Sequence, residues 1–274
     1  MQDVTKGVTQ LSSVLDMGYS SIKRDLVYCY GVTENRIIGI RQTWWSIDNY
    51  SNRKSWIVEQ LKTIPDGKRL LDAGAGNQHY RPFCDHLEYV SQDFGKYDTQ
   101  SIEEGVENTE KWNSLGCDII SDIISIPVED NSFDVILCSE VIGHIKNPVL
   151  AIKEFSRILR PNGTLLLTAP FCSLTHMAPF YYSNGFSKYW YYDVLQDAGL
   201  DISEIKANGN FFSYLAQELI RSIEIFEKYS GKPLSVFDYD TLYNSIKSMM
   251  IQAECTKGSE DVLCFGYFVK AFKR

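Results

Sequence analysis

Two acidic residues and a pair of glycines have the spacing of a small-molecule binding site. A short apolar run ends in Asp72, and Gly74 and Gly76 follow at once. Glycine adopts positive φ readily and has no Cβ, so the backbone after Asp72 can turn sharply and approach a ligand closely. Glycines at this spacing also occur in purely structural turns, and that interpretation stays open at this point.

A second acid downstream favours a nucleotide. Tyr89–Asp93 reads as a short strand ending in a carboxylate, 21 residues after Asp72. In nucleotide-binding α/β units, an acid at the end of the second strand accepts hydrogen bonds from ribose hydroxyls. A dinucleotide site would need a further glycine at the position of His79, to bring a helix N-terminus to the pyrophosphate. The spacing therefore disfavours a dinucleotide.

The Asp-x-Gly-x-Gly arrangement with Asp93 downstream resembles the class I S-adenosylmethionine-dependent methyltransferases. Two later stretches share the resemblance: Asp118–Ile145, which contains Asp-Ile-x-x-Ile-Pro-x-x-Asp-x-Ser-Phe-Asp-x-Ile, and Arg157–Leu165. The matching motifs lie within Leu70–Ala169. A looser Pro-Phe…His…Pro…Tyr pattern in Ala169–Leu200 is similar to methyltransferases that modify bacterial surface glycans and sugars.

The resemblance implies S-adenosylmethionine as cofactor, with S-adenosylhomocysteine as product. The backbone at Gly74 and Gly76 is then expected against the methionyl part of the cofactor. Asp72 would orient the amino group of the cofactor, and Asp93 would hold the ribose hydroxyls. Both acids follow predicted strands, at the carboxyl ends where open α/β sheets bind ligands.

The resemblance assigns four more positions to the cofactor. Asp122 would meet the adenine amino group, with the Ile123 backbone beside it. Ser139 and Glu140, at the end of the fourth predicted strand, would face the methyl-donor end. Asp122 has an alternative role as a turn or helix-capping acid.

Methyl transfer to a hydroxyl needs a base, and histidine suits that role because its ordinary pKa is near neutrality. His144 follows the fourth predicted strand and His176 the fifth, so both are candidates, and either could instead be structural. His79 is expected to pack or face solvent, and His86 shows no role. The histidines have no metal-ligand spacing, so we expect no metal site.

Aromatic side chains are candidates for the wall of an acceptor pocket. Phe171–Tyr192 is crowded with them, and Tyr181 and Tyr182 are the best placed to stack on a sugar or bond its oxygens. Near the N-terminus, Arg41 and Trp45 could pair with an anion or stack on a ring. The alternative is that most of these residues pack against the domain.

The elements around the glycine pair can be predicted from their spacing. Ser55–Ile64 has the spacing of a helix, and the polar segment after the glycines is expected to lead into another. Arg160–Gly163 is expected to end a helix, with Thr164–Ala169 as the fifth strand.

Alternating strand and helix patterns from Arg69 onward predict the scaffold: a Rossmann-like, doubly wound α/β sheet. We expect seven strands, mostly parallel, with an antiparallel last strand. An N-terminal helical segment or lid, residues 1–55, would precede a methyltransferase domain, residues 56–274. A helical insertion, residues 208–261, would separate the last two strands as a lid or a dimer face.

The amino-acid composition limits the kinds of partner that this protein is expected to bind. The 274 residues are 44% apolar, and their net charge of −8 disfavours a broad nucleic-acid surface. No run approaches the roughly 20 apolar residues of a membrane span. Seven cysteines without a Cys-x-x-Cys pair, and a start without a signal pattern, favour the cytoplasm. We expect a small-molecule acceptor, no nucleic-acid or membrane partner, and a homodimer as one option.

Together these patterns predict O-methylation of a small hydroxylated metabolite, such as a sugar or nucleotide-linked sugar. His176 or His144 would be the base. The alternatives are N- or C-methylation of a small metabolite, in which the histidines only orient the substrate, and a non-catalytic scaffold that binds the cofactor.

Overall fold

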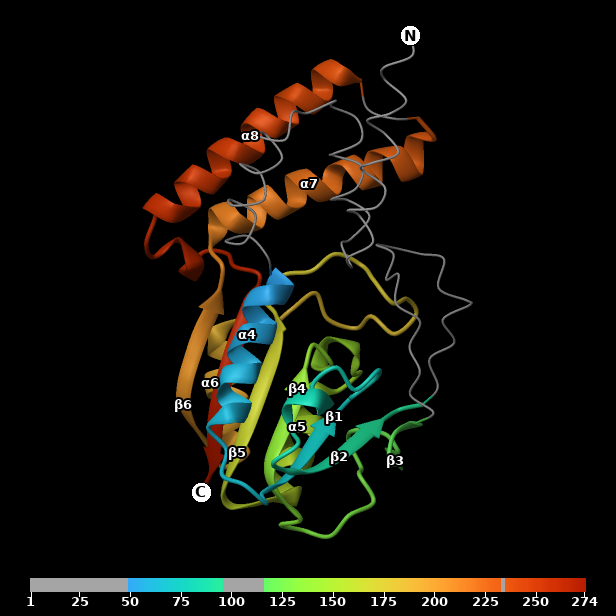
Figure 1. Ribbon diagram of the computed structural model, residues 1–274, viewed down its shortest axis with the longest axis vertical. Coiled ribbons are helices and arrows are strands. Elements are labelled where there is room, and N and C mark those ends of the chain that lie inside the picture. Colours follow the sequence, from blue (N-terminus) through green and yellow to red (C-terminus); the bar gives the residue numbers. More distant parts are fainter. Residues whose placement is uncertain (1–48, 96–115, 233–234) are drawn as a thin grey trace. The chain divides into compact units, whose positions relative to one another are not determined.

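A seven-stranded sheet forms the core of one compact unit of the protein. The computed structural model describes residues 49–95, 116–232 and 235–274. The strand order is β3-β2-β1-β4-β5-β7-β6 (Figure 1). The strands are β1 Arg69–Ala73, β2 Glu88–Asp93, β3 Ile119–Ile120, β4 Phe133–Ser139, β5 Leu159–Pro170, β6 Leu200–Asn208 and β7 Gly266–Lys273.

Strand directions confirm the predicted Rossmann-like sheet. Strands β1 to β5 pair in parallel, whereas β7 runs antiparallel to both of its neighbours, β5 and β6. The strand order reverses between β1 and β4, and open α/β sheets bind ligands at the carboxyl side of such a switch point. The fold therefore brings the ends of β1, β2 and β4 to one edge.

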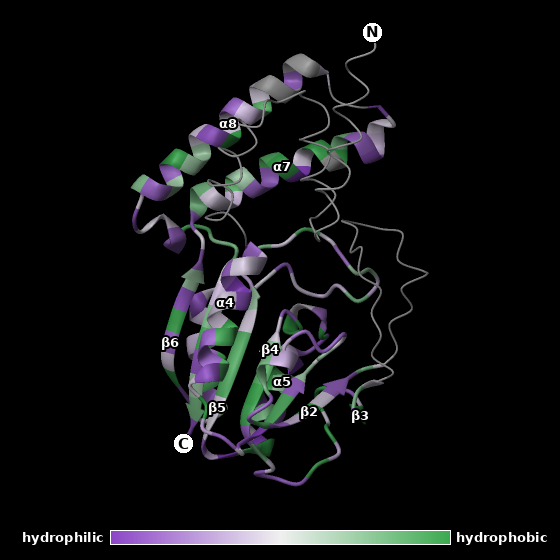
Figure 2. Ribbon diagram, viewed as in Figure 1, coloured by the Kyte–Doolittle hydropathy of each residue, from purple (hydrophilic) through white to green (hydrophobic). Residues whose placement is uncertain are grey.

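The central strands bury side chains on both faces, and Figure 2 shows β4 and β5 as largely hydrophobic. In β4, Leu137 packs in a core with helix α4 (Asn49–Lys62), and Ile136 packs in the core on the other face. That second core contains helices α5 (Pro148–Ile158) and α6 (Lys188–Asp197). Helices on both faces explain why the parallel strands read as continuous apolar runs rather than alternating ones.

Helix α4 is fixed to the β7 side of the sheet. The Trp56 ring, 4% exposed, stacks on Phe268 with ring centroids 5.2 Å apart. Its indole Nε1 donates to Glu204 Oε1 of β6 at 3.3 Å. The sequence predicted this helix over Ser55–Ile64, but it begins at Asn49.

Two local expectations were wrong. We expected a helix directly after the glycines, but the chain makes turns and one short 3₁₀ helix, η1 (Arg81–Phe83). Gln78 adopts a left-handed φ of 55° there, and Pro82 has no N–H to donate. Arg160–Gly163 was expected to lie outside the fifth strand, but it belongs to β5. The pairing of β5 with β4 shifts its register at this point, between Phe133 and Val135 of β4.

A second compact unit contains residues 212–256, whereas the sheet unit contains residues 49–211 and 257–274. Helices α7 (Phe211–Ser230) and α8 (Val236–Cys255) lie within the predicted helical insertion. Ser235 caps α8, its Oγ accepting the Asp238 N–H at 3.2 Å. No helix in the described part of the chain has the length and apolar character to cross a membrane. Residues 1–48 of the predicted N-terminal segment lie outside the described residues.

Gly74 makes the sharp turn at the end of β1. Its φ is +76°, and a Cβ built there would lie 2.4 Å from Cγ2 of Val141, just after β4. Gly199 has a nearly identical φ of +75°, but a Cβ there would meet nothing within 4 Å. Substituting alanine at each of the two glycines therefore separates the free-energy cost of the left-handed backbone from the cost of crowding by Val141.

We predict that Gly74→Ala destabilises the protein more than Gly199→Ala does. Both variants carry the left-handed backbone cost of roughly 1–2 kcal/mol. Only Gly74→Ala also overpacks the contact with Val141, by about 1–3 kcal/mol more. Denaturant unfolding of both variants measures the difference, and adding Val141→Ala to Gly74→Ala should recover part of it. Equal losses for the two single variants would contradict this account.

Candidate active site

The acid that ends β2 holds the glycine loop. Asp93 is 4% exposed, and its Oδ2 accepts the Gly76 N–H at 2.9 Å while its Oδ1 accepts the Gly95 N–H at 3.0 Å. A carboxylate has about four acceptor positions, so both oxygens retain capacity for a ligand hydroxyl. The structure thus brings Asp93 and the glycine loop together, as the spacing predicted.

Gln92 is a second anchor, which the sequence analysis missed. Its backbone oxygen accepts the Gly74 N–H at 2.9 Å, and its Nε2 donates to the Ser121 backbone oxygen at 2.7 Å. The side chain is 1% exposed and therefore links the glycine loop to the segment after β3. A buried glutamine between strand ends has no sequence signature of its own, because its partners are distant in the chain.

Asp72 ends β1 in a buried position. It is 4% exposed and accepts the Tyr89 Oη–H at 2.6 Å. Burial raises the pKa of Asp72 to about 6, partly offset by the Tyr89 hydrogen bond. An acid with this pKa is mostly ionised at neutral pH and is suited to attract a ligand cation.

Asp122 forms a turn. Its Oδ1 accepts the Ile124 N–H at 3.1 Å, and its backbone oxygen accepts the Ser125 N–H. Ile123 beside it is 4% exposed and packs in the core that contains α5. This geometry corresponds to the alternative role of Asp122 as a turn acid, and contact with an adenine stays a prediction.

The segment after β4 forms a polar cluster at the same edge. Glu140 has an unusual φ of 62°, and its N–H donates to the Thr168 backbone oxygen at 2.9 Å. Thr168 Oγ1 donates to Glu140 Oε1 at 3.0 Å and lies 3.1 Å from Ser139 Oγ. The other carboxylate oxygen of Glu140 pairs with Arg53 Nη1 of α4 at 3.3 Å.

These contacts hold Glu140 in a backbone conformation that non-glycine residues rarely adopt, and such conformations cluster at functional sites. Thr168 and Arg53 were not among the sequence candidates. They lie 28 residues after and 87 residues before Glu140, so only the fold brings them together.

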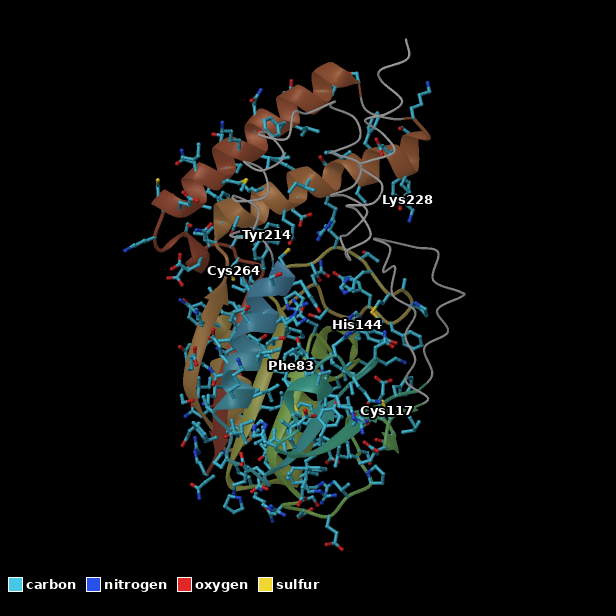
Figure 3. All side chains as sticks on the ribbon, in the orientation of Figure 1. Phe83, Cys117, His144, Tyr214, Lys228 and Cys264 are labelled. Atoms are coloured by element: carbon cyan, nitrogen blue, oxygen red, sulfur yellow. The ribbon has the colours of Figure 1, made fainter. Side chains whose placement is uncertain are left out.

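The two candidate histidines touch each other. The rings of His144 (in η3, Ile142–His144) and His176 lie 4.9 Å apart, nearly perpendicular. His144 lies at the end of the sheet where β4 stops (Figure 3). Its Nδ1 is 2.6 Å from the Phe180 backbone oxygen, and Nδ1 of His176 is 2.7 Å from that of Leu174.

A carbonyl oxygen only accepts, so Nδ1 carries the proton in both rings. Each neutral ring therefore has its lone pair on Nε2. Burial lowers the pKa of His144 below its usual value, and the neighbouring His176 lowers it further. His144 is thus neutral, and able to accept a proton, at physiological pH.

The loop between β5 and α6 is attached to η3. The backbone N–H groups of Tyr182 and Ser183 both donate to the Gly143 oxygen, at 3.1 and 3.2 Å. Tyr181 belongs to the histidine cluster: its ring lies 5.2 Å from that of His176, and its hydroxyl donates to the Ser173 oxygen at 2.7 Å.

Tyr182 faces outward. Its side chain is 42% exposed, with Lys146 Nζ 5.7 Å from the ring centroid. The other two predicted acceptor contacts, Arg41 and Trp45, lie outside the described residues. Of the two predicted acceptor contacts within the described residues, Tyr181 lies with its ring against His176, whereas the ring of Tyr182 is exposed.

A cavity of about 330 Å³ lies at the opposite edge of the sheet, among Lys68, Asp134, Gly163 and Lys270. It is remote from the glycine loop and from both histidines along the strands. Within the described residues, no three His, Cys, Asp or Glu side chains are grouped as a metal site.

We predict that the burial of Asp72 makes stability depend on pH. Its carboxyl has a pKa of about 6 when folded and about 3.9 when unfolded, so the folded state binds more protons between these values. Wild-type stability should therefore fall, relative to Asp72→Asn, as pH rises from about 4 to 6, by on the order of 2–3 kcal/mol. The asparagine oxygen can still accept the Tyr89 hydrogen bond.

Denaturant unfolding of both proteins across this pH range measures the difference in free energy. A difference that stays constant with pH, or grows in the opposite direction, would show that Asp72 is not desolvated as the structure indicates.

Comparison with known proteins relates this arrangement to a family. A model described as a methyltransferase domain matches residues 51–218, more than half of the chain. The demethylmenaquinone methyltransferase of Staphylococcus haemolyticus is 25% identical over 128 residues, which cover 44% of this chain and 52% of that protein. The ubiquinone/menaquinone biosynthesis C-methyltransferase UbiE of Ruegeria is 28% identical over 134 residues, 47% of this chain and 49% of the relative.

The chain thus spans about half the length of these curated relatives. Among solved structures, a putative methyltransferase from Bacillus halodurans has a TM-score of 0.46 at 15% identity, covering 81% of this chain and 99% of that one. Phosphoethanolamine N-methyltransferase 2 of Haemonchus contortus has a TM-score of 0.44 at 19% identity, covering 93% and 60%. From the match to residues 51–218, the chain belongs to the methyltransferase-domain family.

Proposed function

We propose that this protein is an S-adenosylmethionine-dependent methyltransferase. The proposal rests on one observation: the ends of β1, β2 and β4 meet, and all three lie within residues 51–218, which the family model matches. The glycine loop after β1, the buried acid of β2 and the Glu140 cluster after β4 lie at one sheet edge, next to the switch point.

The chemistry of these groups fits the cofactor. Free acceptor positions on Asp93 suit the two ribose hydroxyls, and the buried Asp72 carboxylate suits an ammonium group. Gly74 and Gly76, both at positive φ, leave the backbone open to close approach. S-adenosylmethionine, when bound, supplies a methyl group on a positively charged sulfur.

We propose His144 as the base and a hydroxyl as the acceptor. Nε2 of His144 would take the hydroxyl proton while the acceptor oxygen accepts the methyl group that S-adenosylmethionine would supply, with the carbon–sulfur electron pair left on the cofactor sulfur. The Nδ1–H bond to Phe180 fixes the tautomer that this step needs. His176 and Tyr181 would orient the acceptor beside it.

The acceptor class that we propose is a small hydroxylated metabolite, such as a sugar or nucleotide-linked sugar. Support comes from the aromatic and hydroxyl-bearing side chains around His176. C-methylation is the second candidate, because curated relatives of this chain are named as quinone methyltransferases. On that alternative the histidines orient the acceptor without taking a proton from oxygen.

Calorimetric titration with S-adenosylhomocysteine tests the cofactor assignment. Wild-type protein should bind it, and Asp93→Ala should weaken binding by about 1 kcal/mol or more, the size of a lost charge-assisted hydrogen bond. Asp85→Ala, which removes an exposed acid from the same connection between β1 and β2, is the matched control and should bind normally. A wild type that does not bind would refute the proposal.

The histidines are tested by nuclear magnetic resonance titration of the imidazole nitrogens, which needs no acceptor. His144 should show the Nδ1–H tautomer and titrate below its usual pKa of about 6.5. Replacing the ring in His176→Gln should raise the His144 pKa toward that value, because the electrostatic contribution of His176 lowers it. An acceptor can be identified as a compound that makes the wild-type protein release S-adenosylhomocysteine. With that acceptor, His144→Gln should lower kcat by about 100-fold or more while binding S-adenosylhomocysteine normally. Undiminished turnover in that variant would favour an acceptor that needs no base.

A further inference from the structure

The cavity of about 330 Å³ at the sheet edge away from the glycine loop has an apolar base. The base consists of Val135 of β4, Leu166 of β5 and Phe272 of β7, and the first two are almost fully buried. Ile64 and Pro65, just after helix α4, form one wall. Pockets that bind small molecules begin at roughly this volume and are lined mainly by apolar side chains.

A bulge in β5 forms another wall. Residues 160–163 oppose the single residue Asp134 of β4, because the pairing shifts its register there. Residues 161–163 line the cavity. Gly163 lets the bulge fold tightly, since a Cβ there would lie 2.7 Å from the Arg160 backbone oxygen. Bulges occur often beside functional sites, where they redirect the chain.

Lys270 of β7 contributes a positive charge to this cavity that no acid of the described residues neutralises. It is half-buried, and its Nζ donates to Gln60 Oε1 at 3.0 Å and lies 5.7 Å from the Phe272 ring centroid. Within the described chain, Nζ makes no other hydrogen bond and no ion pair. Glu204, its partner in the register of β6, instead accepts the Trp56 indole N–H. An ammonium group has three N–H donors, so two are left for a ligand.

The acid that lines the cavity is already paired. Asp134 Oδ1 lies 3.1 Å from Lys68 Nζ, and its Oδ2 accepts from Arg160 Nη1 at 2.6 Å. Around the cavity, three cations, Lys68, Arg160 and Lys270, therefore face two acids, Asp134 and Glu204. The local charge favours an anion, and Lys270 is the cation with donors to spare.

We propose that this cavity binds a small monocarboxylic acid with an apolar body. The carboxylate accepts from the Lys270 ammonium group, and the apolar body covers Val135, Leu166 and Phe272. A phosphate ester would bring more charge than one unpaired cation offsets, and it would not cover the apolar base. The site is separate from the proposed function, because it lies toward the amino ends of the parallel strands, whereas the proposed cofactor groups stand at their carboxyl ends.

Three probes separate the charge from the apolar body. Benzoate has both, benzyl alcohol has the ring alone, and acetate has the carboxylate alone. Backbone amide shifts in nuclear magnetic resonance titrations of the whole chain report where each probe binds and how tightly. Benzoate should bind in the millimolar range and shift the amides of Gly163 and Lys270. It should bind about fivefold or more tightly than either partial probe, as expected for one charge-assisted hydrogen bond or one buried ring.

Lys270→Gln tests the cation. Glutamine can still donate to Gln60 but has no charge, so benzoate should bind about fivefold or more weakly and benzyl alcohol within about twofold of wild type. Retained benzyl alcohol binding shows that the cavity is intact. Lys62→Gln is the matched control, because it removes an exposed charge from the last turn of α4 that does not line the cavity. It should leave both affinities unchanged.

Several results would overturn this inference. They are a wild type that binds benzoate no better than benzyl alcohol or acetate, benzoate shifts confined to other parts of the chain, and a Lys62→Gln variant that loses as much affinity as Lys270→Gln. Equal weakening of benzoate and benzyl alcohol in Lys270→Gln would also count against it. The result is independent of the cofactor, since Lys270→Gln should bind S-adenosylhomocysteine as wild type does.

Discussion

The site depends on hydrogen bonds that the end of β2 makes to the loop after β1. Asp93 accepts the Gly76 N–H, and the backbone of Gln92 accepts the Gly74 N–H. Both side chains are almost fully buried, so an unpaired carboxylate or amide here would cost about 1–3 kcal/mol or more. The loop conformation, the burial of Asp93 and the position of the second strand are therefore one coupled arrangement.

A similar coupling operates after β4, with partners from more distant parts of the chain. Thr168 of β5 fixes the Glu140 backbone and one carboxylate oxygen, and Arg53 of α4 takes the other. Val141, the next residue, fills the space that a side chain at Gly74 would need. The exits of β1 and β4 are thus packed against each other, so a change in either segment alters the surface presented to a ligand.

The sequence predicted features of the site that depend on local spacing, and missed those that depend on the fold. Asp72, Gly74 and Asp93 could be found because strand ends and turn glycines leave a pattern within about 20 residues. Arg53, Gln92 and Thr168 carry no such pattern, since their roles arise only when separate strands and α4 come together. The expected helix after the glycines failed for a local reason, the left-handed Gln78 and the nearby Pro82.

The two sides of the site are built differently, and this difference separates cofactor binding from acceptor selection. The proposed cofactor groups stand on strand ends that are fixed by buried hydrogen bonds. The histidine side stands on the loop between β5 and α6, attached to η3 through Gly143 and through the His144 contact with Phe180. Loops on a rigid scaffold vary more readily than the strands that carry them. Members of one family can therefore share the cofactor side while their loops select different acceptors, and the proposed acceptor contacts of this protein, His144, His176 and Tyr181, all lie on η3 and on that loop.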